Sequence, residues 1–381
     1  MAVTAAGTIR VALVGVHGHG RFHLDAIRRL SGPLGIELVG LCDRRPLTDD
    51  IRALAGSVPM HDRLPDLLTA AAPDVTIIAT PIHTHVDLAL LALDSGSHLL
   101  LEKPPAPTLA GYSRLARGVD RSGLACQVGF QSLGSPAAAA VRRLIDGGAV
   151  GTVHGVGAVG CWRRDESYYA RAPWAGRRWL DGIPVVDGAV TNPFAHAVIS
   201  ALSVAGAEAL GDVHRAETDL YHANDIEADD TSAVRLVTRT GVTITVAVTL
   251  CAARKVDPHV IVDGSRGRIT LWYTRDEVHL QAGRVDEVTR YPRTDLLANL
   301  VAHVRDPGAD LLVPLARAGS FMQVVEVVCR APEPSPIPAA CQRIEGADGA
   351  RRHVVTGIDE AVTSAATGLR LFRELGLPWA R

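Results

Sequence analysis

The first 130 residues alternate between short apolar runs and segments in which apolar residues recur at helical spacing. The run TIRVALVG, residues 8–15, is continuous in β-branched and aliphatic residues and ends in glycine. Such a run is typical of a strand buried on both faces of a parallel sheet. Similar runs end near Asp43, Thr80 and Glu102, and helical patterns separate them. We therefore expect an α/β fold here: a dinucleotide-binding Rossmann domain over residues 1–130, with a doubly wound parallel sheet.

Beyond residue 130 the pattern changes to β runs that follow one another with few helices between them. Residues 231–250, TSAVRLVTRTGVTITVAVTL, contain two such runs joined by the turn signal TRTG. We expect a substrate-binding and oligomerisation α+β domain over residues 131–381, built on a large open, mostly antiparallel sheet. Residues 357–375 are amphipathic, and we expect them to form a last helix that packs back on this sheet.

Composition and charge narrow the class of protein. Hydrophobic residues make up 47% and charged residues 21% of the chain, as in ordinary globular proteins, and the net charge of −2 gives no basic surface for nucleic acid. No apolar run approaches the roughly 18 residues of a membrane span, and the start of the chain lacks the basic region of a secretory signal. The six cysteines are scattered without a CxxC pair. We expect buried thiols in a cytoplasmic protein.

The stretch GVHGHGRFH, residues 15–23, raises the first question of chemistry. It follows a predicted strand and opens a predicted helix, and Asp43 ends the second strand, which is the context that a dinucleotide-binding fingerprint requires. Gly15 would make the tight turn, and Gly20 would allow the helix to pack closely on the strand. The helix N-terminus would then face the pyrophosphate, and Asp43 would accept hydrogen bonds from the adenosine ribose.

Two features of this stretch depart from the usual fingerprint. His17 stands where a second glycine normally lets the backbone approach the phosphates, so either Gly18 supplies that approach or the imidazole itself reaches the cofactor. His19 and His23 have the spacing of two metal ligands on one helix face. No acidic or cysteine ligand lies nearby in the sequence, so we expect no metal site. A further alternative is that His19 is simply a solvent-facing loop residue.

The end of the second predicted strand bears on the choice of cofactor. The Asp43 carboxylate would repel a 2′-phosphate, which favours NAD. Arg44 and Arg45 follow at once and could bind that phosphate if Asp43 turned away, so NADP stays possible.

The segment IIATPIHTHVDLALLALDSGSHLLLEKPPAPTLA, residues 77–110, followed by VGFQ, resembles the Gfo/Idh/MocA family of nicotinamide-dependent oxidoreductases. Its most specific element is the tripeptide EKP at residues 102–104, where family members carry a lysine that faces the substrate and the nicotinamide. Lys103 is one of only two lysines among 39 basic residues, and a lysine can give up a proton whereas an arginine cannot. The fingerprint and the resemblance together assign the cofactor to Gly15, His17, Gly18, His19, Gly20, Asp43, Arg44, Thr80, Pro81, His85, Glu102 and Lys103.

A second family signature is a glycine-rich stretch, then Asp or Asn, three residues, and a histidine that opens a helix. The chain offers DGAVTNPFAHAVISALSVAG, residues 187–206. Counted back from the end of the helix, His196 matches the signature histidine and Asn192 the Asp/Asn position, while Asp187 stands where glycine is usual. A frame that starts at Asp187 would instead put Thr191 at the histidine position.

The stretch DESYYARAPWAGRRW, residues 165–179, resembles the tyrosine- and tryptophan-rich stretch of the family, with the expected arginine displaced to Arg177. Its aromatic residues either line the cleft or form a strut that packs the second domain on the first. Under the first interpretation the substrate contacts are Lys103, Tyr168, Trp174, Arg177, Asp187, Asn192 and His196.

The resemblance implies hydride transfer between NAD(P) and a secondary alcohol or ketone of a sugar or cyclic polyol. His196 would act as general base, Lys103 would stabilise the developing alkoxide, and Asn192 would orient the substrate. Family members commonly pair their sheets face to face, so we expect a homo-oligomer, a dimer or tetramer, through the C-terminal sheet. The alternatives are an NAD-dependent glycosidase of the same family and a non-catalytic sugar or dinucleotide sensor.

Overall fold

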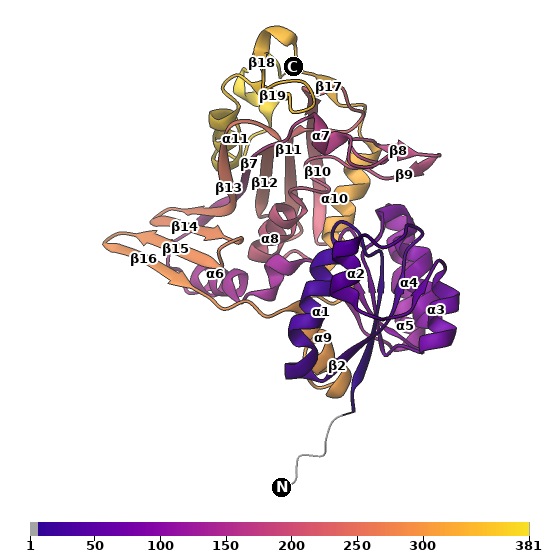
Figure 1. The fold of residues 1–381 in the computed structure, drawn as a ribbon. Helices are drawn as coiled ribbons and strands as arrows, with labels where there is room; N and C mark the ends of the chain where they lie inside the picture. The colour runs from indigo at the N-terminus through magenta and orange to yellow at the C-terminus, as the bar shows by residue number, and fades with distance from the viewer. Residues whose placement is uncertain (1–6, 381) are drawn as a thin grey trace. The chain divides into compact units, whose positions relative to one another are not determined.

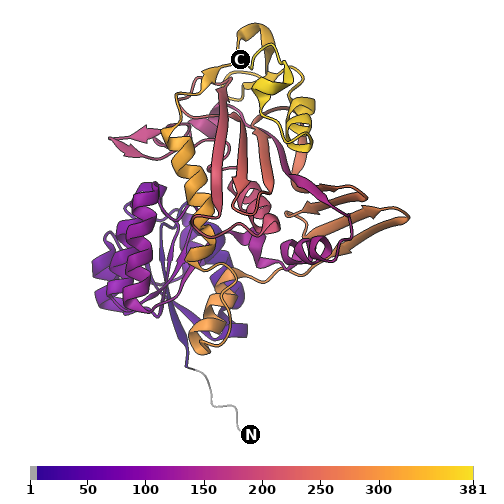
Figure 2. The ribbon, with the colours of Figure 1, turned by 180° about the vertical axis from the view of Figure 1, so that it is seen from behind.

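The structure is a computed structural model that describes residues 7–380. It divides into two units (Figures 1 and 2). Unit 1 runs to Gly134 and also includes Thr294–Ala316, and unit 2 contains Ser135–Arg293 and the chain from Arg317 onward. The expected division after residue 130 lies close to the end of the first segment, but residues 294–316, expected in the second domain, belong to unit 1.

Unit 1 is built on a six-stranded sheet in the order β3-β2-β1-β4-β5-β6, and every strand pair in it is parallel. The strands are β1 (Ile9–Val14), β2 (Ile36–Cys42), β3 (Met60–His61), β4 (Val75–Ile78), β5 (His98–Leu101) and β6 (Cys126–Val128). The order reverses between β1 and β4, and ligands of such sheets bind at the carboxyl ends of the strands beside this reversal. The predicted Rossmann fold is confirmed.

Helices cover both faces of this sheet, as its buried strands require. Val11, Ala12 and Leu13 in β1 have no exposed surface, so the apolar run that identified the strand reflects burial on both sides. Figure 1 shows α3, α4 and α5 on one side of the sheet and α1, α2 and α9 on the other. These helices are α1 (Gly20–Leu34), α2 (Asp49–Ala55), α3 (Leu64–Ala71), α4 (His85–Asp94), α5 (Leu109–Ser122) and α9 (Leu296–Arg305), with short 3-10 turns η1 (Ile82–Thr84) and η2 (Gln131–Gly134).

A buried glutamine ties the returning segment to unit 1. Gln127 has no exposed surface, and its amide nitrogen donates to the Leu296 carbonyl (3.1 Å) and to Asn299 Oδ1 (2.7 Å). Its amide oxygen accepts from the Val313 backbone N–H at 2.8 Å. All three of these hydrogen bonds go to residues 294–316, which explains why the segment belongs to unit 1.

Unit 2 contains a nine-stranded sheet in the order β16-β15-β14-β13-β7-β12-β11-β10-β17. The pairs β12–β7 and β10–β17 are parallel and the others antiparallel, which confirms the mostly antiparallel character. The strands are β7 (Val153–Arg163), β10 (Val213–His222), β11 (Thr231–Thr238), β12 (Thr243–Thr249), β13 (Cys251–Gly264), β14 (Gly267–Trp272), β15 (Glu277–Ala282), β16 (Val285–Arg290) and β17 (Ser335–Pro336). Two small hairpins are β8 (Trp179–Leu180) with β9 (Ile183–Pro184), and β18 (Gln342–Glu345) with β19 (Arg352–Val355).

Further helices and 3-10 turns lie between residues 137 and 375. They are α6 (Ala137–Asp146), α7 (Glu166–Tyr169), α8 (Ala195–Ala205), η3 (Leu315–Ala318), α10 (Gly319–Arg330), η4 (Ala339–Cys341), α11 (Ile358–Thr367) and η5 (Phe372–Leu375).

Glycines in β7 let helices approach both faces of the central strands of unit 2. A Cβ on Gly160 would lie 2.3 Å from the Phe194 ring at the start of α8, and a Cβ on Gly157 would lie 2.6 Å from the carbonyl of Ala366 in α11. Because side chains alternate along a strand, α8 and α11 cover opposite faces. The last helix packs on the sheet as expected, although it ends at Thr367. Both faces of the sheet are therefore covered at these strands, and the homo-oligomer through this sheet stays a prediction.

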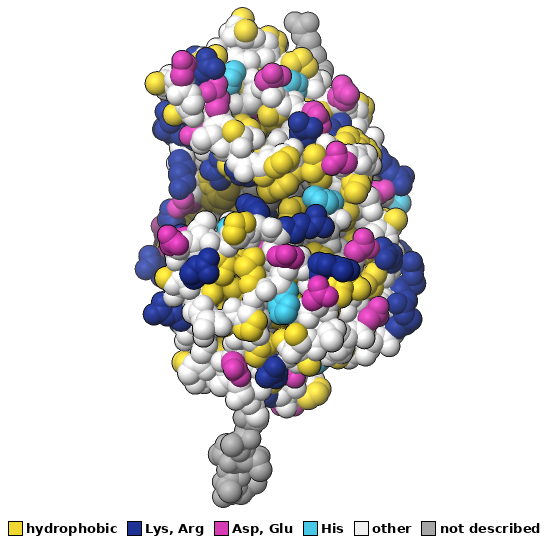
Figure 3. Space-filling view, turned by 45° about the vertical axis from the view of Figure 1, so that its right-hand side comes forward, with side chains coloured by type: hydrophobic (Ala, Val, Ile, Leu, Met, Phe, Trp, Pro, Cys, Tyr) yellow, Lys and Arg dark blue, Asp and Glu magenta, His cyan; other side chains and the backbone are white. Residues whose placement is uncertain are grey.

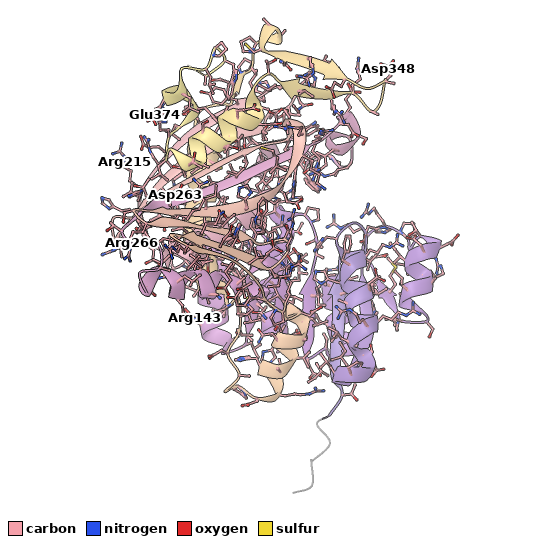
Figure 4. All side chains as sticks on the ribbon, turned by 90° about the vertical axis from the view of Figure 1, so that its left-hand side faces the viewer. Arg143, Arg215, Asp263, Arg266, Asp348 and Glu374 are labelled. Atoms are coloured by element: carbon pink, nitrogen blue, oxygen red, sulfur yellow. The ribbon has the colours of Figure 1, made fainter. Side chains whose placement is uncertain are left out.

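The cysteines are free thiols, and the charged side chains on the surface are mixed in sign. All six cysteines are free thiols, and four of them are buried. Within residues 7–380, no helix is both long and apolar enough to cross a bilayer. Basic and acidic side chains are interspersed over most of the face seen in Figure 3. Figure 4 shows Arg215, Asp263 and Glu374 on the outside of unit 2, where each has an ion-pair partner.

Candidate cofactor and substrate sites

The glycine-rich turn connects β1 to α1 in unit 1, and two of its glycines are sterically required. Gly15 has φ +82°, and a Cβ there would lie 2.6 Å from the Ala79 carbonyl oxygen. A Cβ on Gly20 would lie 1.9 Å from the carbonyl oxygen of Gly15. Gly15 thus makes the tight turn and Gly20 lets the helix approach it, as predicted. Since α1 has no acidic residue in its first turn and no side-chain cap, the positive end of its dipole can act on an anion.

The middle of this turn is compatible with both alternatives for phosphate binding, backbone approach at Gly18 and a contact from the His17 imidazole. Gly18 is exposed, has φ +59°, and has no atom within 4 Å of the position of a Cβ, so backbone approach is open there. The Nε2 atom of His17 is buried and has no hydrogen-bond partner. An unsatisfied buried nitrogen is a position where a ligand atom or water is expected.

Asp43 lies just after β2 and is bound to the glycine-rich turn. Its Oδ2 accepts from the Val16 backbone N–H at 3.0 Å, and its Oδ1 accepts from the Arg45 N–H at 2.9 Å. The side chains of Arg44 and Arg45 are exposed. The carboxylate is therefore held next to the turn, where the fingerprint requires it for a ribose.

Glu102, at the end of β5, links this turn to Lys103. The Glu102 side chain is buried, and its Oε1 lies 2.9 Å from His23 Nε2, 3.2 Å from His19 Nε2 and 3.1 Å from the Gln131 amide nitrogen. Its Oε2 accepts from the Lys103 backbone N–H at 3.2 Å. Burial opposes ionisation of Glu102, but the hydrogen bonds from His19 and His23 outweigh it and hold its pKa well below the usual range. The hydrogen bond between His19 and Glu102 in turn raises the pKa of His19.

This cluster corrects one sequence argument. We set aside a metal site because no acidic ligand lies near the histidines in the sequence, but the fold brings Glu102 to them. The ligand atoms of His19, His23 and Glu102 lie within 4.8 Å of one another, so the three residues could hold a metal ion. The Glu102 carboxylate also accepts hydrogen bonds from Gln131 and from the Lys103 N–H, so its burial does not require a metal ion.

The prediction that His85 faces the cofactor is wrong. The His85 side chain is 1% exposed, and its Nδ1 and Nε2 lie 2.8 Å from the carbonyl oxygens of Pro104 and Thr80. Burial lowers the pKa of His85. The ring therefore ties the Thr80–Pro81 turn to the Lys103–Pro104 turn, and neither ring nitrogen is available to a ligand.

Asp187 and Asn192 meet in unit 2, just before α8. Asp187 is 5% exposed, and its Oδ1 accepts from the Asn192 amide nitrogen at 2.5 Å. Its Oδ2 accepts from the Gly176 N–H (2.9 Å) and pairs with Arg171 (2.8 Å). The aspartate at the usual glycine position thus fixes the orientation of Asn192. His196 is half-buried in the first turn of α8, so it does open a helix, as predicted.

A second buried aspartate shapes the loop before Asn192. Asp229 accepts from Ser232 Oγ at 2.5 Å and from the Val190 N–H at 3.4 Å, and burial raises its pKa. A Cβ on Gly188 would lie 1.9 Å from Asp229 Oδ1, so only glycine fits there. Sequence reasoning missed Asp229 because it lies about forty residues away from the loop that it supports.

Tyr168 and Trp174 contact arginines rather than each other. The Arg171 guanidinium lies 3.7 Å from the centre of the Tyr168 ring and 4.7 Å from that of Trp174. Arg177, the arginine selected from the sequence, is exposed and makes no ion pair or ring contact within residues 7–380. Sequence reasoning chose Arg177 from the position of a family pattern. The signal for Arg171 was its place between the tyrosines and Trp174.

The predicted residues therefore form two groups, one in each unit. Unit 1 assembles a set around the glycine-rich turn and Glu102: Gly15, His17, Gly18, His19, Gly20, Asp43, Glu102 and Lys103. In unit 2, Asp187 binds Asn192 and pairs with Arg171, which stacks on Tyr168 and Trp174. His196 lies in the first turn of α8, four residues after Asn192.

Each of the two units matches a known protein family. Residues 9–130 match the model of an oxidoreductase family with an NAD-binding Rossmann fold, and residues 138–270 match the model of the GFO/IDH/MocA C-terminal domain. The chain is similar to inositol 2-dehydrogenase 1 of Saccharopolyspora erythraea, with 32% identity over 142 residues, 36% of this chain and 42% of that protein. The match thus spans less than half of that relative.

Two matches cover more of the chain. D-apiose dehydrogenase of Paraburkholderia graminis is 28% identical over 284 residues, 71% of this chain and 70% of that protein. Among solved structures, the WlbA dehydrogenase from Bordetella pertussis, in complex with NADH and UDP-GlcNAcA, superposes with a TM-score of 0.69 at 23% identity, over 85% of this chain and 96% of that chain. The latter likeness concerns the fold alone.

Proposed function

Because the chain belongs to the Gfo/Idh/MocA family of NAD-binding oxidoreductases, we propose that it is an NAD(P)-dependent dehydrogenase or reductase. It would transfer hydride between the nicotinamide and a secondary alcohol or ketone of a sugar or cyclic polyol. The observation that carries this proposal is the Glu102 carboxylate. It accepts hydrogen bonds from His19, just before α1, from His23 within α1 and from the Lys103 N–H. It joins the predicted phosphate-binding turn to the predicted catalytic lysine at one end of one sheet.

NAD supplies the hydride acceptor, and the protein supplies binding and alignment. Gly15, Gly18 and Gly20 would accommodate the pyrophosphate, and Asp43 would bind the adenosine ribose. The position of Asp43 beside the turn supports NAD over NADP, because a carboxylate there would repel a 2′-phosphate.

In the oxidative direction His196 would take the hydroxyl proton, since an imidazole titrates near the working pH. Lys103 would hydrogen-bond the same oxygen and stabilise the developing alkoxide. Asn192 donates its amide N–H to Asp187, and this contact fixes the orientation in which Asn192 would meet the substrate. The named activities of the relatives, on inositol and D-apiose, support a polyol or sugar as substrate.

The test is reduction of NAD by the purified protein with myo-inositol, scyllo-inositol and D-apiose, followed by nicotinamide absorbance. We expect Lys103→Ala and His196→Ala each to lower kcat/KM by about 10²–10⁴-fold. Lys255→Ala, which removes the other lysine at an exposed position of β13, is the matched control and should act like wild type.

Two results would contradict the proposal. When a glycoside is offered together with NAD, release of a reducing sugar from it without a net change in nicotinamide absorbance would indicate the glycosidase instead. Binding of NAD and a sugar with no turnover in either direction would indicate the sensor.

A further inference from the structure

Arginine and aromatic side chains gather at the end of β7 in unit 2. We call Trp162, Arg164, Tyr168, Arg171 and Trp174 the arginine–aromatic cluster. The Arg164 guanidinium lies 5.0 Å from the centre of the Trp162 ring and 4.8 Å from that of Tyr168. The Arg171 guanidinium stacks over the rings of Tyr168 and Trp174. Each guanidinium is therefore held by two aromatic rings, an arrangement that fixes its plane.

The two arginines differ in their ionic partners. Arg171 pairs with the buried carboxylate of Asp187 at 2.8 Å. Arg164 makes no ion pair with any carboxylate of residues 7–380; its Nη1 donates to the Arg163 carbonyl at 3.1 Å, and its Nε is buried without a partner. A buried guanidinium N–H without a partner is costly unless an acceptor completes it.

A second donor in the cluster also lacks a hydrogen-bond acceptor. The indole Nε1 of Trp162 is buried and has no hydrogen-bond partner. The Trp162 ring contacts Phe194, with ring centres 4.5 Å apart, so it lies on the face of the sheet that α8 covers. An indole N–H and a guanidinium can only donate hydrogen bonds. The missing partner must therefore offer acceptor atoms, and Arg164 favours one with negative charge.

The cluster is connected to the predicted substrate residues. Phe194 is the residue before α8 and precedes His196 by two positions. On the other side, Asp187 holds both Arg171 and the Asn192 amide. These shared contacts place the unfilled donors within the same network that orients Asn192.

We propose that the substrate carries an anionic oxygen group, a carboxylate or a phosphate, which Arg164 binds with help from the Trp162 N–H. The planar guanidinium offers paired donors that match the two oxygens of such a group. This inference rests on the proposed dehydrogenase and narrows its substrate class from sugars and polyols in general to acidic sugars or sugar phosphates. A neutral polyol would leave Arg164 without a counter-charge.

The test is anion binding to the full-length protein saturated with NAD, followed by thermal stability at constant ionic strength in sodium chloride. The probes are D-glucuronate, L-tartrate and inorganic phosphate, with D-glucose as the neutral partner of glucuronate. We expect at least one anion, but not D-glucose, to stabilise the wild type. Arg164→Gln should weaken that anion at least tenfold. Stronger binding of the carboxylates or of phosphate identifies which group the site takes.

The matched control is Arg284→Gln, which removes an exposed arginine between β15 and β16 that has no ion pair within residues 7–380. It should bind the anion like wild type. If Arg164→Gln does not fold, Arg164→Lys keeps the charge but loses the paired donors, so it should bind with intermediate affinity. The proposal is overturned if no probe stabilises the wild type beyond sodium chloride, or if the Arg164 variant that folds binds anions as the wild type does.

Titration of NAD alone on the same samples separates the two claims. If NAD binds and no anion does, this inference fails while the dehydrogenase stands. If an anion stabilises the protein in an Arg164-dependent way and NAD does not bind, the inference stands while the proposed function fails.

Discussion

Glu102 shows why single residues in this chain are hard to interpret from the sequence. It was selected as a neighbour of Lys103, yet its strongest contacts are with His19 and His23, about eighty residues earlier. His85 shows the opposite error: a histidine in a loop expected to pass the cofactor has both ring nitrogens against backbone carbonyls. The partners of Glu102 are distant in sequence. The burial of His85, which decides its role, has no local signal.

Cofactor choice is a prediction at the residue scale. Asp43→Ser removes the charge that would repel a 2′-phosphate and leaves Arg44 and Arg45 exposed beside it. We expect the ratio of NAD to NADP affinity to fall about tenfold or more, which corresponds to about 1.4 kcal/mol. Titration of both cofactors, followed by intrinsic fluorescence, measures the ratio. Asp49→Ser, at an exposed position in the first turn of α2, should leave the ratio unchanged. An unchanged ratio in Asp43→Ser would remove Asp43 from the ribose site.

At the scale of elements, the sequence was most informative where local sterics or uniform burial decide the structure. The strands of unit 1 were predicted from continuous apolar runs, and the roles of Gly15 and Gly20 follow from the turn they make. The return of residues 294–316 to unit 1 was not predicted, because it depends on the buried amide of Gln127. The covering of both faces of the second sheet was also missed, since the amphipathic pattern of α11 does not say which face it covers.

The contact of α1 with the glycine-rich turn gives a prediction at this scale. Gly20→Ala would put a methyl group 1.9 Å from the Gly15 carbonyl oxygen, so the helix must move away from the turn. We expect a loss of about 1–3 kcal/mol of stability in urea unfolding, and NAD affinity reduced more than about tenfold.

Gly32→Ala is the matched control in the same helix, because nothing lies within 4 Å of its added methyl group. It should leave NAD affinity unchanged and raise helix stability by up to about 1 kcal/mol. Wild-type NAD affinity in Gly20→Ala would show that the close approach of α1 does not serve cofactor binding.

For the whole molecule, one buried and two half-buried histidines predict sensitivity to acid. Burial lowers the pKa values of His85, His98 and His259 in the folded protein. The unfolded chain therefore takes up protons near pH 6.5, before the folded chain does, and stability should fall as the pH drops below about 6.5. His19, whose pKa is raised, acts in the opposite direction.

Urea unfolding at a series of pH values measures this dependence. His85→Gln should make it shallower, whereas His279→Gln, at an exposed ion pair with Asp286, should not. Stability that is constant or increases on acidification between about pH 7 and pH 5.5 would contradict the lowered pKa values of these three histidines.

The central claim is that the turn GVHGHG binds the pyrophosphate of a dinucleotide, and the most direct measurement is thermal stability of cofactor-stripped protein during titration with NAD, NADP and, separately, zinc. A ligand of the folded state stabilises it by about 2.7 kcal/mol at a hundred times its Kd. We predict a rise in melting temperature with NAD, a smaller one with NADP and none with zinc. No rise with either dinucleotide would contradict the account, and a rise with zinc alone would assign His19, His23 and Glu102 to a metal site instead.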